Sequence, residues 1–166
     1  MRAMAPNEAL RRELLSRAVR PAADGNADRL WDILDDYEAW PGFRLVGIDG
    51  EHAAWLIAQL GDPDLQRRCL EHLEIAVDAG DAPPAHLACL EDRVRMAEGK
   101  PQKYGSQWVV GANGDLAPWP IADPHLVDER RAQVGMLPLA AQRVQMEIEY
   151  AEHGAPQWPI TSGPPR

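Results

Sequence analysis

Apolar side chains recur at every third or fourth position through the first hundred residues, a spacing that predicts amphipathic helices. The predicted helices span residues 7–19, 26–38, 50–60, 63–79 and 84–98. Side chains suited to N-capping stand at the start of four of them, namely Asn7, Asn26, Asp49 and Asp62. The helix at 50–60 is the most apolar, so we expect it to be central and mostly buried.

The pattern changes after Gly99. Residues 106–110 favour a strand, Asn113-Gly114 is a strong signal for a hairpin turn, and residues 116–119 form the returning strand. Asp123-Pro124 and Pro138 then begin a sixth helix, ending at Gly135, and a seventh, ending near Glu152. The predicted fold is mainly α, with about seven helices and one small β-hairpin near residues 106–119.

The length of 166 residues fits one domain with a tail. We expect a single helical domain over residues 1–153 and a Pro/Gly-rich tail over residues 154–166. The helices before the hairpin differ in length and signature, and no fixed-period repeat is present.

The formal net charge of −9 argues against nucleic acid and against an anionic membrane surface as partners, because both are bound through clustered Lys and Arg. No run of 18 apolar residues and no signal-peptide pattern is seen. Two cysteines, Cys69 and Cys89, do not make a disulfide framework. We expect a reduced, cytoplasmic compartment. The sequence leaves the oligomeric state open.

Four metal-ligand side chains occur as Cys69-x-x-His72 and His86-x-x-Cys89. Each pair shares a helix face. If the two helices are antiparallel, however, Cys69 and His86 lie about 10 Å apart along the axis, which one zinc ion cannot span. We therefore expect a metal-independent protein with no cofactor and with cysteines buried on apolar faces.

Other catalytic patterns are weak. Four carboxylates on the helix at 26–38 are typical of a solvated face, and no serine sits in a nucleophile elbow. No phosphate-binding loop is present either. The segment Gln102–Gln107 is more informative, since it places three neutral hydrogen-bonding side chains, Gln102, Tyr104 and Gln107, around Gly105. By composition alone, it is typical of a polar loop that enters a hairpin.

The order of several motifs resembles an uncharacterised bacterial family, a domain of unknown function with a Gln-x-Tyr-Gly-Thr-Gln signature. The matching motifs are Trp40-Pro41, Ala54-Trp55-Leu56 through Gln59, Leu90-Glu91-Asp92-Arg93, Gln102–Gln107, Arg130-Arg131 and Gly135-Met136-Leu137-Pro138. Two positions depart from the pattern. Ser106 stands in place of Thr and keeps the hydroxyl, whereas Leu60 stands in place of a His and removes an imidazole.

The resemblance implies a shared polar site made of Gln59, Asp92, Arg93, Gln102, Tyr104, Gln107 and Arg131. We expect a pocket between the helices at 50–60 and 84–98 and the hairpin, with Trp55 or Trp108 as a wall. Tyr104 is the candidate catalytic residue, as acid–base or orienting group. Arg93 or Arg131 would hold a carboxylate or phosphate.

The function expected from these residues is the binding of a small polar or anionic molecule. An enzyme of this kind would work by positioning and by proton transfer assisted by Tyr104. The alternative is a non-catalytic protein-interaction or scaffold module in which the same residues form a structural polar network.

Overall fold

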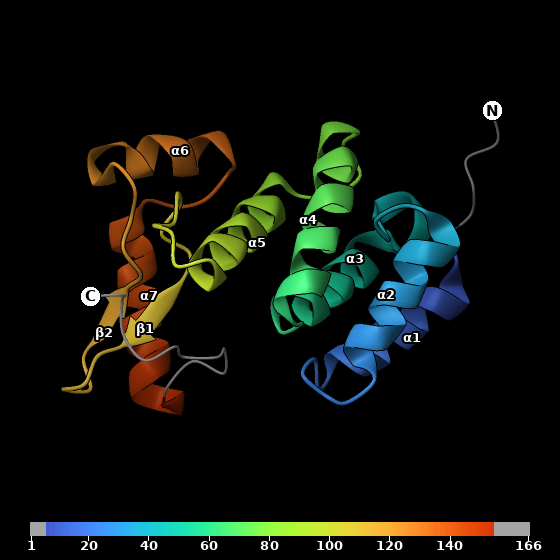
Figure 1. The fold of residues 1–166 in the computed structure, drawn as a ribbon, viewed down its shortest axis with the longest axis horizontal. Helices are drawn as coiled ribbons and strands as arrows, with labels where there is room; N and C mark the ends of the chain where they lie inside the picture. The colour runs from blue at the N-terminus through green and yellow to red at the C-terminus, as the bar shows by residue number, and fades with distance from the viewer. Residues whose placement is uncertain (1–5, 155–166) are drawn as a thin grey trace. The chain divides into compact units, whose positions relative to one another are not determined.

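The computed structural model describes residues 6–154, and in this part of the chain the fold is mainly α, as predicted. The elements are seven α-helices and one small antiparallel sheet of two strands (Figure 1). The chain divides into two compact units, residues 1–87 and residues 88–166, and the division falls within helix α5 (Pro84–Ala97). The expected single domain over residues 1–153 stays a prediction.

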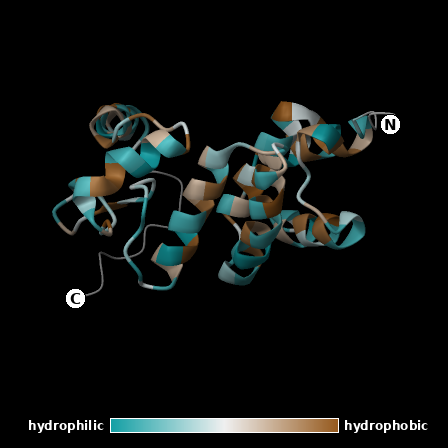
Figure 2. Cartoon of the chain, turned by 90° about the horizontal axis from the view of Figure 1, so that it is seen from above, coloured by the Kyte–Doolittle hydropathy of each residue, from teal (hydrophilic) through white to brown (hydrophobic). Residues whose placement is uncertain are grey.

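The first unit contains four helices and the first turn of α5. They are α1 (Glu8–Ala18), α2 (Asn26–Tyr37), α3 (Phe43–Gln59) and α4 (Pro63–Asp78). Helix α1 packs along α3, and each helix carries apolar and polar faces (Figure 2). The core consists of side chains less than 2% exposed, including Leu14, Leu30, Ile33, Leu34, Val46, Ile57, Leu65 and Leu73.

Two of the predicted N-caps are confirmed. The side chain of Asn7 accepts the backbone N–H of Leu10 at 3.0 Å. Oδ1 of Asp62 accepts the backbone N–H groups of Asp64 and Leu65, both at 2.9 Å, with Pro63 at the first helical position. These caps satisfy donors that a helix leaves unpaired at its start.

The prediction for Asn26 is wrong. Gly25 is the N-cap of α2, and Asn26 is a buried residue of its first turn. Its amide instead donates to the carbonyls of Arg17, Arg20 and Pro21 at 2.9–3.3 Å. Asn26 therefore anchors the loop between α1 and α2.

The third helix begins earlier than predicted. It starts at Phe43 rather than at residue 50, and it is interrupted at Gly47, whose φ of 75° and ψ of 175° are not helical. A positive φ of this size costs glycine little, which explains how the chain turns there. Asp49, the predicted cap, lies inside the helix and forms an ion pair with Arg11.

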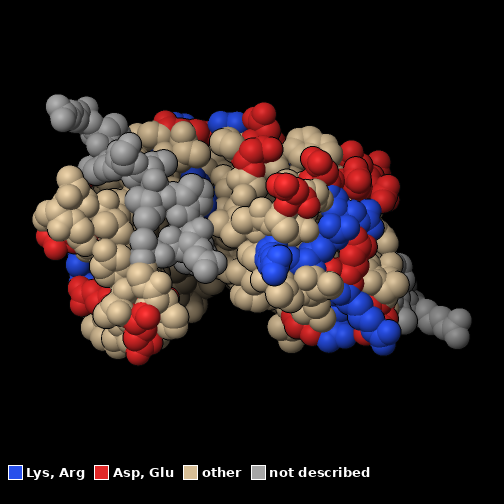
Figure 3. Space-filling model, turned by 90° about the horizontal axis from the view of Figure 1, so that it is seen from below, with Lys and Arg blue, Asp and Glu red and all other residues tan. Residues whose placement is uncertain are grey.

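Surface charges of both signs interleave over the first unit (Figure 3). Glu13, for example, accepts from Arg29 at 2.7 Å and from Arg17 at 2.9 Å. The carboxylate is about one-third exposed, as are both arginines. Pairs of this kind contribute little each, about 1 kcal/mol or less.

The second unit contains the rest of α5, the hairpin and two further helices. The strands are β1 (Trp108–Val110) and β2 (Leu116–Pro118), followed by a 3₁₀ turn (Pro124–Leu126), α6 (Val127–Gln133) and α7 (Leu139–His153). Trp108 pairs with Pro118 and Val110 with Leu116. The predicted hairpin is therefore confirmed.

A small apolar cluster holds the hairpin in the second unit. Met96 of α5, Val109 of β1 and Trp119 are each less than 10% exposed and form one cluster. The Trp119 indole also donates to the carbonyl of Lys100 at 2.9 Å. Because two strands alone are marginal, this packing is what makes the hairpin stable.

The predicted start of the sixth helix is wrong in detail. Asp123 has a φ of 43° and makes no capping bond, and the chain passes through the 3₁₀ turn before α6 begins. Among the described residues, no helix combines the length and apolar character needed to cross a membrane. The predicted tail, residues 154–166, lies outside the described residues except for Gly154.

Candidate functional site

Asp92 of α5 organises the loop that carries Tyr104. It is wholly buried, and its Oδ1 accepts the backbone N–H groups of Lys103 at 2.7 Å and Tyr104 at 3.1 Å. Its Oδ2 accepts the N–H of Ser106 at 3.1 Å and the Ser106 hydroxyl at 2.8 Å. Burial raises the pKa of Asp92, and these hydrogen bonds oppose that shift. The carboxylate thus braces a loop through backbone donors.

Gln102 ties the start of the loop to its end. Its Nε2 donates to the carbonyls of Gln107 at 2.9 Å and Trp119 at 2.8 Å, and its Oε1 accepts the N–H of Gln107 at 2.8 Å. The side chain is 0% exposed. All of these partners are backbone groups, so the Gln102 amide has a structural role.

Gln107 links the loop to α5. Its Oε1 accepts from Arg93 at 3.1 Å, and its Nε2 donates to the Ser106 hydroxyl at 3.1 Å and, at 3.4 Å, to the carbonyl of Cys89. Gly105 lies between the two glutamines with a φ of 67°. A Cβ there would stand 2.8 Å from Leu139, so the predicted close approach is made by protein side chains.

Arg93 and Arg131 are buried cations. They are 3% and 2% exposed, and no carboxylate within residues 6–154 lies at ion-pair distance from either guanidinium. Burial lowers the pKa of Arg93 to about 10 and also lowers that of Arg131. Arg131 donates to the carbonyl of Tyr104 at 2.6 Å, to that of Leu137, and to Oε1 of Gln142.

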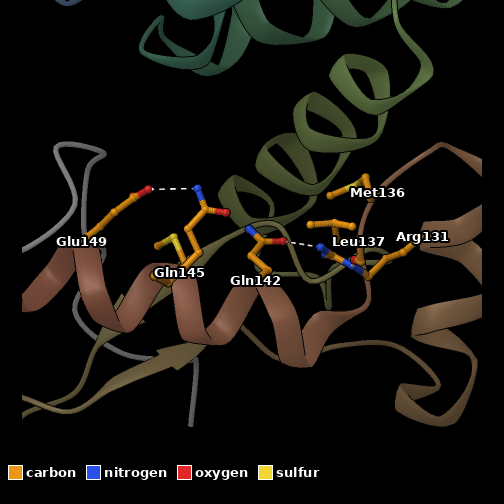
Figure 4. A pocket seen from close by; sticks show the side chains of 7 residues that line it. Arg131, Met136, Leu137, Gln142, Gln145 and Glu149 are labelled. Carbon is orange, nitrogen blue, oxygen red and sulfur yellow. Dashed lines mark hydrogen bonds between the residues drawn. The ribbon is translucent and has the colours of Figure 1, made fainter.

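Arg131 also lines a pocket of about 220 Å³ in the second unit (Figure 4). The lining residues are Arg131, Met136, Leu137, Gln142, Gln145, Met146 and Glu149. Arg131 stands at one end of the row of side chains and Glu149 at the other, where it accepts from Gln145 at 3.1 Å (Figure 4). The pocket therefore has a guanidinium at one end and a carboxylate at the other.

Tyr104 lies outside that lining. Its N–H and carbonyl are used by Asp92 and Arg131, while its hydroxyl has no hydrogen-bond partner within the described residues. Burial, with a smaller contribution from Glu91, raises the pKa of the phenol above its usual 10. The hydroxyl is therefore protonated at neutral pH, which suits a donor rather than a base.

The predicted site residues belong to different units. Asp92, Arg93, Gln102, Tyr104, Gln107 and Arg131 come together in the second unit, whereas Trp55 and Gln59 belong to the first. The Gln59 carbonyl accepts from Gln66 at 2.9 Å, and its Nε2 is buried without a partner in the described structure. Trp55 donates to the carbonyl of His86 at 3.1 Å.

A buried carboxylate in the first unit was not predicted. Glu51 is 0% exposed, and its Oε1 accepts from the Trp40 indole at 3.0 Å and from Nδ1 of His86 at 3.1 Å. Its Oε2 lies 2.9 Å from the same Nδ1 but has no hydrogen-bond partner among the described residues. His52 lies beside His86, and its pKa is lowered by burial and by that second ring. In the sequence, His86 was one part of a weak zinc pattern, and Glu51 was not singled out by any motif.

The zinc pattern does not form a site. Within residues 6–154, no three side chains of the His, Cys, Asp and Glu types are grouped to hold a metal ion. Cys69 and Cys89 are free thiols. Burial raises the pKa of both, that of Cys89 to about 11, so neither is a reactive thiolate at neutral pH.

The geometry gives the order of the resembling motifs a physical basis, because most of them meet in the network around Asp92. A family model matches residues 8–152. The chain belongs to DUF6624, a family of unknown function. No curated protein and no solved structure is significantly similar to the chain. Membership of DUF6624 therefore identifies relatives without supplying an activity.

Proposed function

We propose that this protein binds a small polar molecule with an anionic group in the pocket lined by Arg131. One observation carries the proposal, a buried guanidinium without a carboxylate at ion-pair distance among the described residues. A buried charge is costly unless it is paired. Asp128 and Asp92 act on Arg131 only from beyond ion-pair distance, and an anionic ligand would supply a counter-charge in direct contact.

The hydrogen bonds of Arg131 leave donors for such a ligand. A guanidinium has five N–H groups, and three are used, by the carbonyls of Tyr104 and Leu137 and by Gln142. The remaining N–H groups suit a carboxylate or a phosphate. Met136 and Met146 would contact an apolar body, and Glu149 would accept from a donor at its far end.

Binding is better supported than catalysis in this pocket. Tyr104 does not line it, so the predicted proton transfer by Tyr104 has no geometric support there. We therefore expect Tyr104→Phe to leave ligand affinity unchanged. An affinity loss of about tenfold, measured by calorimetry, would restore Tyr104 to the site.

The proposal can be tested with inorganic phosphate and citrate as probes, by thermal shift and titration calorimetry. Arg131→Lys keeps the charge but loses the planar fork, so affinity should fall about tenfold. Gln145→Ala removes an exposed lining side chain with little risk to the fold. Gln133→Ala, exposed on α6 and absent from the lining, is the matched control.

Binding weakened by Arg131→Lys and Gln145→Ala, with Gln133→Ala unchanged and all circular dichroism spectra alike, would support the proposal. No binding of either probe by the wild type, or equal weakening by Gln133→Ala, would overturn it.

An interaction module is the second candidate. The network around Gln102 is bonded internally, and two large apolar side chains of α7, Val144 and Ile148, are 57% and 53% exposed. Light scattering can test self-association through this face. A wild-type mass that stays monomeric at high protein concentration, and that Val144→Glu does not change, would count against self-association. We also propose a reducing, cytoplasmic compartment, supported by the two free cysteines.

A further inference from the structure

The first unit holds a carboxylate–imidazole pair that does not involve the Arg131 pocket. Glu51 is 0% exposed, and Nδ1 of His86 lies 2.9 Å from its Oε2 and 3.1 Å from its Oε1. The indole of Trp40 donates to Oε1 at 3.0 Å. Burying a carboxylate requires such partners, and here both are side chains rather than backbone groups.

The pair determines which nitrogen of His86 carries the proton. A carboxylate accepts hydrogen bonds, so Nδ1 must be the protonated nitrogen of the neutral ring. Nε2 then carries a lone pair. The His86 side chain is 15% exposed, so the ring is mostly enclosed, and its Nε2 faces the exposed residue His52.

The His86 ring is held in a single orientation. Trp55 stacks flat on it, with ring centroids 4.3 Å apart and an interplanar angle of 9°. The Trp55 indole also donates to the backbone carbonyl of His86 at 3.1 Å. A base that is oriented before its substrate arrives loses little entropy in the reaction.

His52 stands beside the unprotonated nitrogen. Its Nδ1 lies 3.5 Å from Nε2 of His86, at the outer limit of a hydrogen bond, so a donor at an ordinary distance would bind Nε2 more strongly than His52 does. His52 is exposed, and its ring centroid is 5.4 Å from that of His86. The two rings border the place where a small substrate or a water molecule would meet Nε2.

We propose that His86 is the general base of a hydrolytic site in the first unit, acting on a small carboxylic ester. Glu51 is a positioning residue, and Trp55 fixes the ring. The five side chains here (Trp40, Glu51, His52, Trp55 and His86) include two imidazoles and no permanent cation, and His86 is the imidazole that is bonded to Glu51. That set suits attack by water on a carbonyl better than attack on a phosphate, which requires cationic contacts.

The step is balanced with water as the co-reactant. A water O–H gives its proton to Nε2 of His86 while the water oxygen bonds to the ester carbonyl carbon. The tetrahedral intermediate then collapses, the bond from carbon to the leaving oxygen breaks, and Nε2 returns the proton to that oxygen. The Glu51 carboxylate stabilises the imidazolium that forms in between, as the carboxylate of a catalytic triad does.

The probe is p-nitrophenyl acetate, whose hydrolysis releases coloured p-nitrophenolate. His86→Asn is the first variant, because the Asn amide can still donate to Glu51 but has no base at the position of Nε2. We expect at least a tenfold loss of the enzyme-dependent rate. His125→Asn is the matched control, since His125 is exposed and lies in the second unit; its rate should equal that of the wild type.

Glu51→Gln tests the positioning role. The neutral amide cannot stabilise an imidazolium, so kcat should fall about tenfold with KM nearly unchanged. The wild-type rate should also fall in D₂O. A rate lost equally by His125→Asn and His86→Asn, or a KM effect alone in Glu51→Gln, would overturn the proposal.

A measurement on the unmodified chain keeps the proposal testable if His86→Asn fails to fold. Nitrogen-15 NMR of the imidazoles should show His86 as the Nδ1-protonated tautomer, with a downfield Nδ1 proton that disappears in Glu51→Gln. The opposite tautomer in the wild type would overturn it. The Arg131 pocket shares no residue with this site, so failure here leaves ligand binding in the second unit untouched.

Discussion

The two units each bury a carboxylate, and they use it differently. Asp92 in the second unit accepts from the backbone N–H groups of three residues and one hydroxyl, whereas Glu51 in the first accepts from an indole and an imidazole. A backbone N–H can only donate. An imidazole has a second nitrogen, so the state of Glu51 affects a group that can react. A buried acid therefore points to chemistry only when one of its partners, like an imidazole, has a second atom that can accept or donate a proton.

The largest effect should come from the closed network. Gln102→Ala removes three hydrogen bonds and leaves buried backbone groups of Gln107 and Trp119 without partners. We expect a loss of about 3 kcal/mol or more in the free energy of unfolding, measured by urea denaturation. Gln133→Ala, an exposed glutamine of the same unit, should lose less than about 0.5 kcal/mol.

A cost for Gln102→Ala as small as that of Gln133→Ala would show that the network is not a structural brace. The second candidate function would then lose its main support.

The second effect compares the two acids directly. Asp92→Asn places an amide NH₂ opposite backbone N–H groups, which can donate but cannot accept. The free energy of unfolding should therefore fall by about 2 kcal/mol. Glu51→Gln should cost about 1 kcal/mol or less, because the His86 ring can change tautomer and accept from the new amide. Urea denaturation of both variants measures the difference. Equal losses of unfolding free energy in the two variants would contradict the proposed difference between the two buried acids.

The third effect concerns backbone packing. Gly105 and Gly80 both have positive φ, 67° and 68°, but only Gly105 has neighbours that a Cβ would meet. Gly80→Ala should cost about 1 kcal/mol through its backbone conformation alone. Gly105→Ala should cost about 1 kcal/mol more, because its Cβ would lie 2.8 Å from Leu139. Thermal unfolding of the two variants, if indistinguishable, would contradict the close packing of the loop.

The smallest effect is the pH dependence of a surface pair in the first unit. The hydrogen bond from Arg29, with a second from Arg17, lowers the pKa of Glu13 below 4.5. Glu13 therefore stabilises the fold above that value, and this contribution is lost as pH falls through the lowered pKa. Glu13→Gln should lose up to about 1 kcal/mol at pH 7 and nothing at pH values below the lowered pKa. A Glu13→Gln variant that is equally destabilised at pH 7 and in acid would rule out the ion pair as the cause.

The stability contributed by Asp92 should respond to pH in the opposite direction. Burial raises its pKa, so the folded state favours the protonated acid and stability from this group falls as pH rises through the raised pKa.

Much of the fold could be predicted because it depends on neighbours in the chain. The Asp62-Pro63 start and the Asn113-Gly114 turn are short-range features, and both predictions hold. The failures, at Asn26 and Asp123, have a common cause. Capping depends on the backbone angles of the preceding loop and on rival acceptors, and in Asn26 the carbonyls of the α1–α2 loop take the amide.

The sequence by itself predicted most of the helices and the hairpin, because spacing and turn chemistry act over a few residues, whereas the resemblance to a family, rather than composition, drew attention to the Gln102–Gln107 segment. Only the tertiary structure decided what the polar residues do. It commits Gln102 to backbone groups and joins Glu51 to His86 across 35 residues of chain. Periodicity does not distinguish a buried glutamate from a solvated one, because burial depends on which helix packs over it.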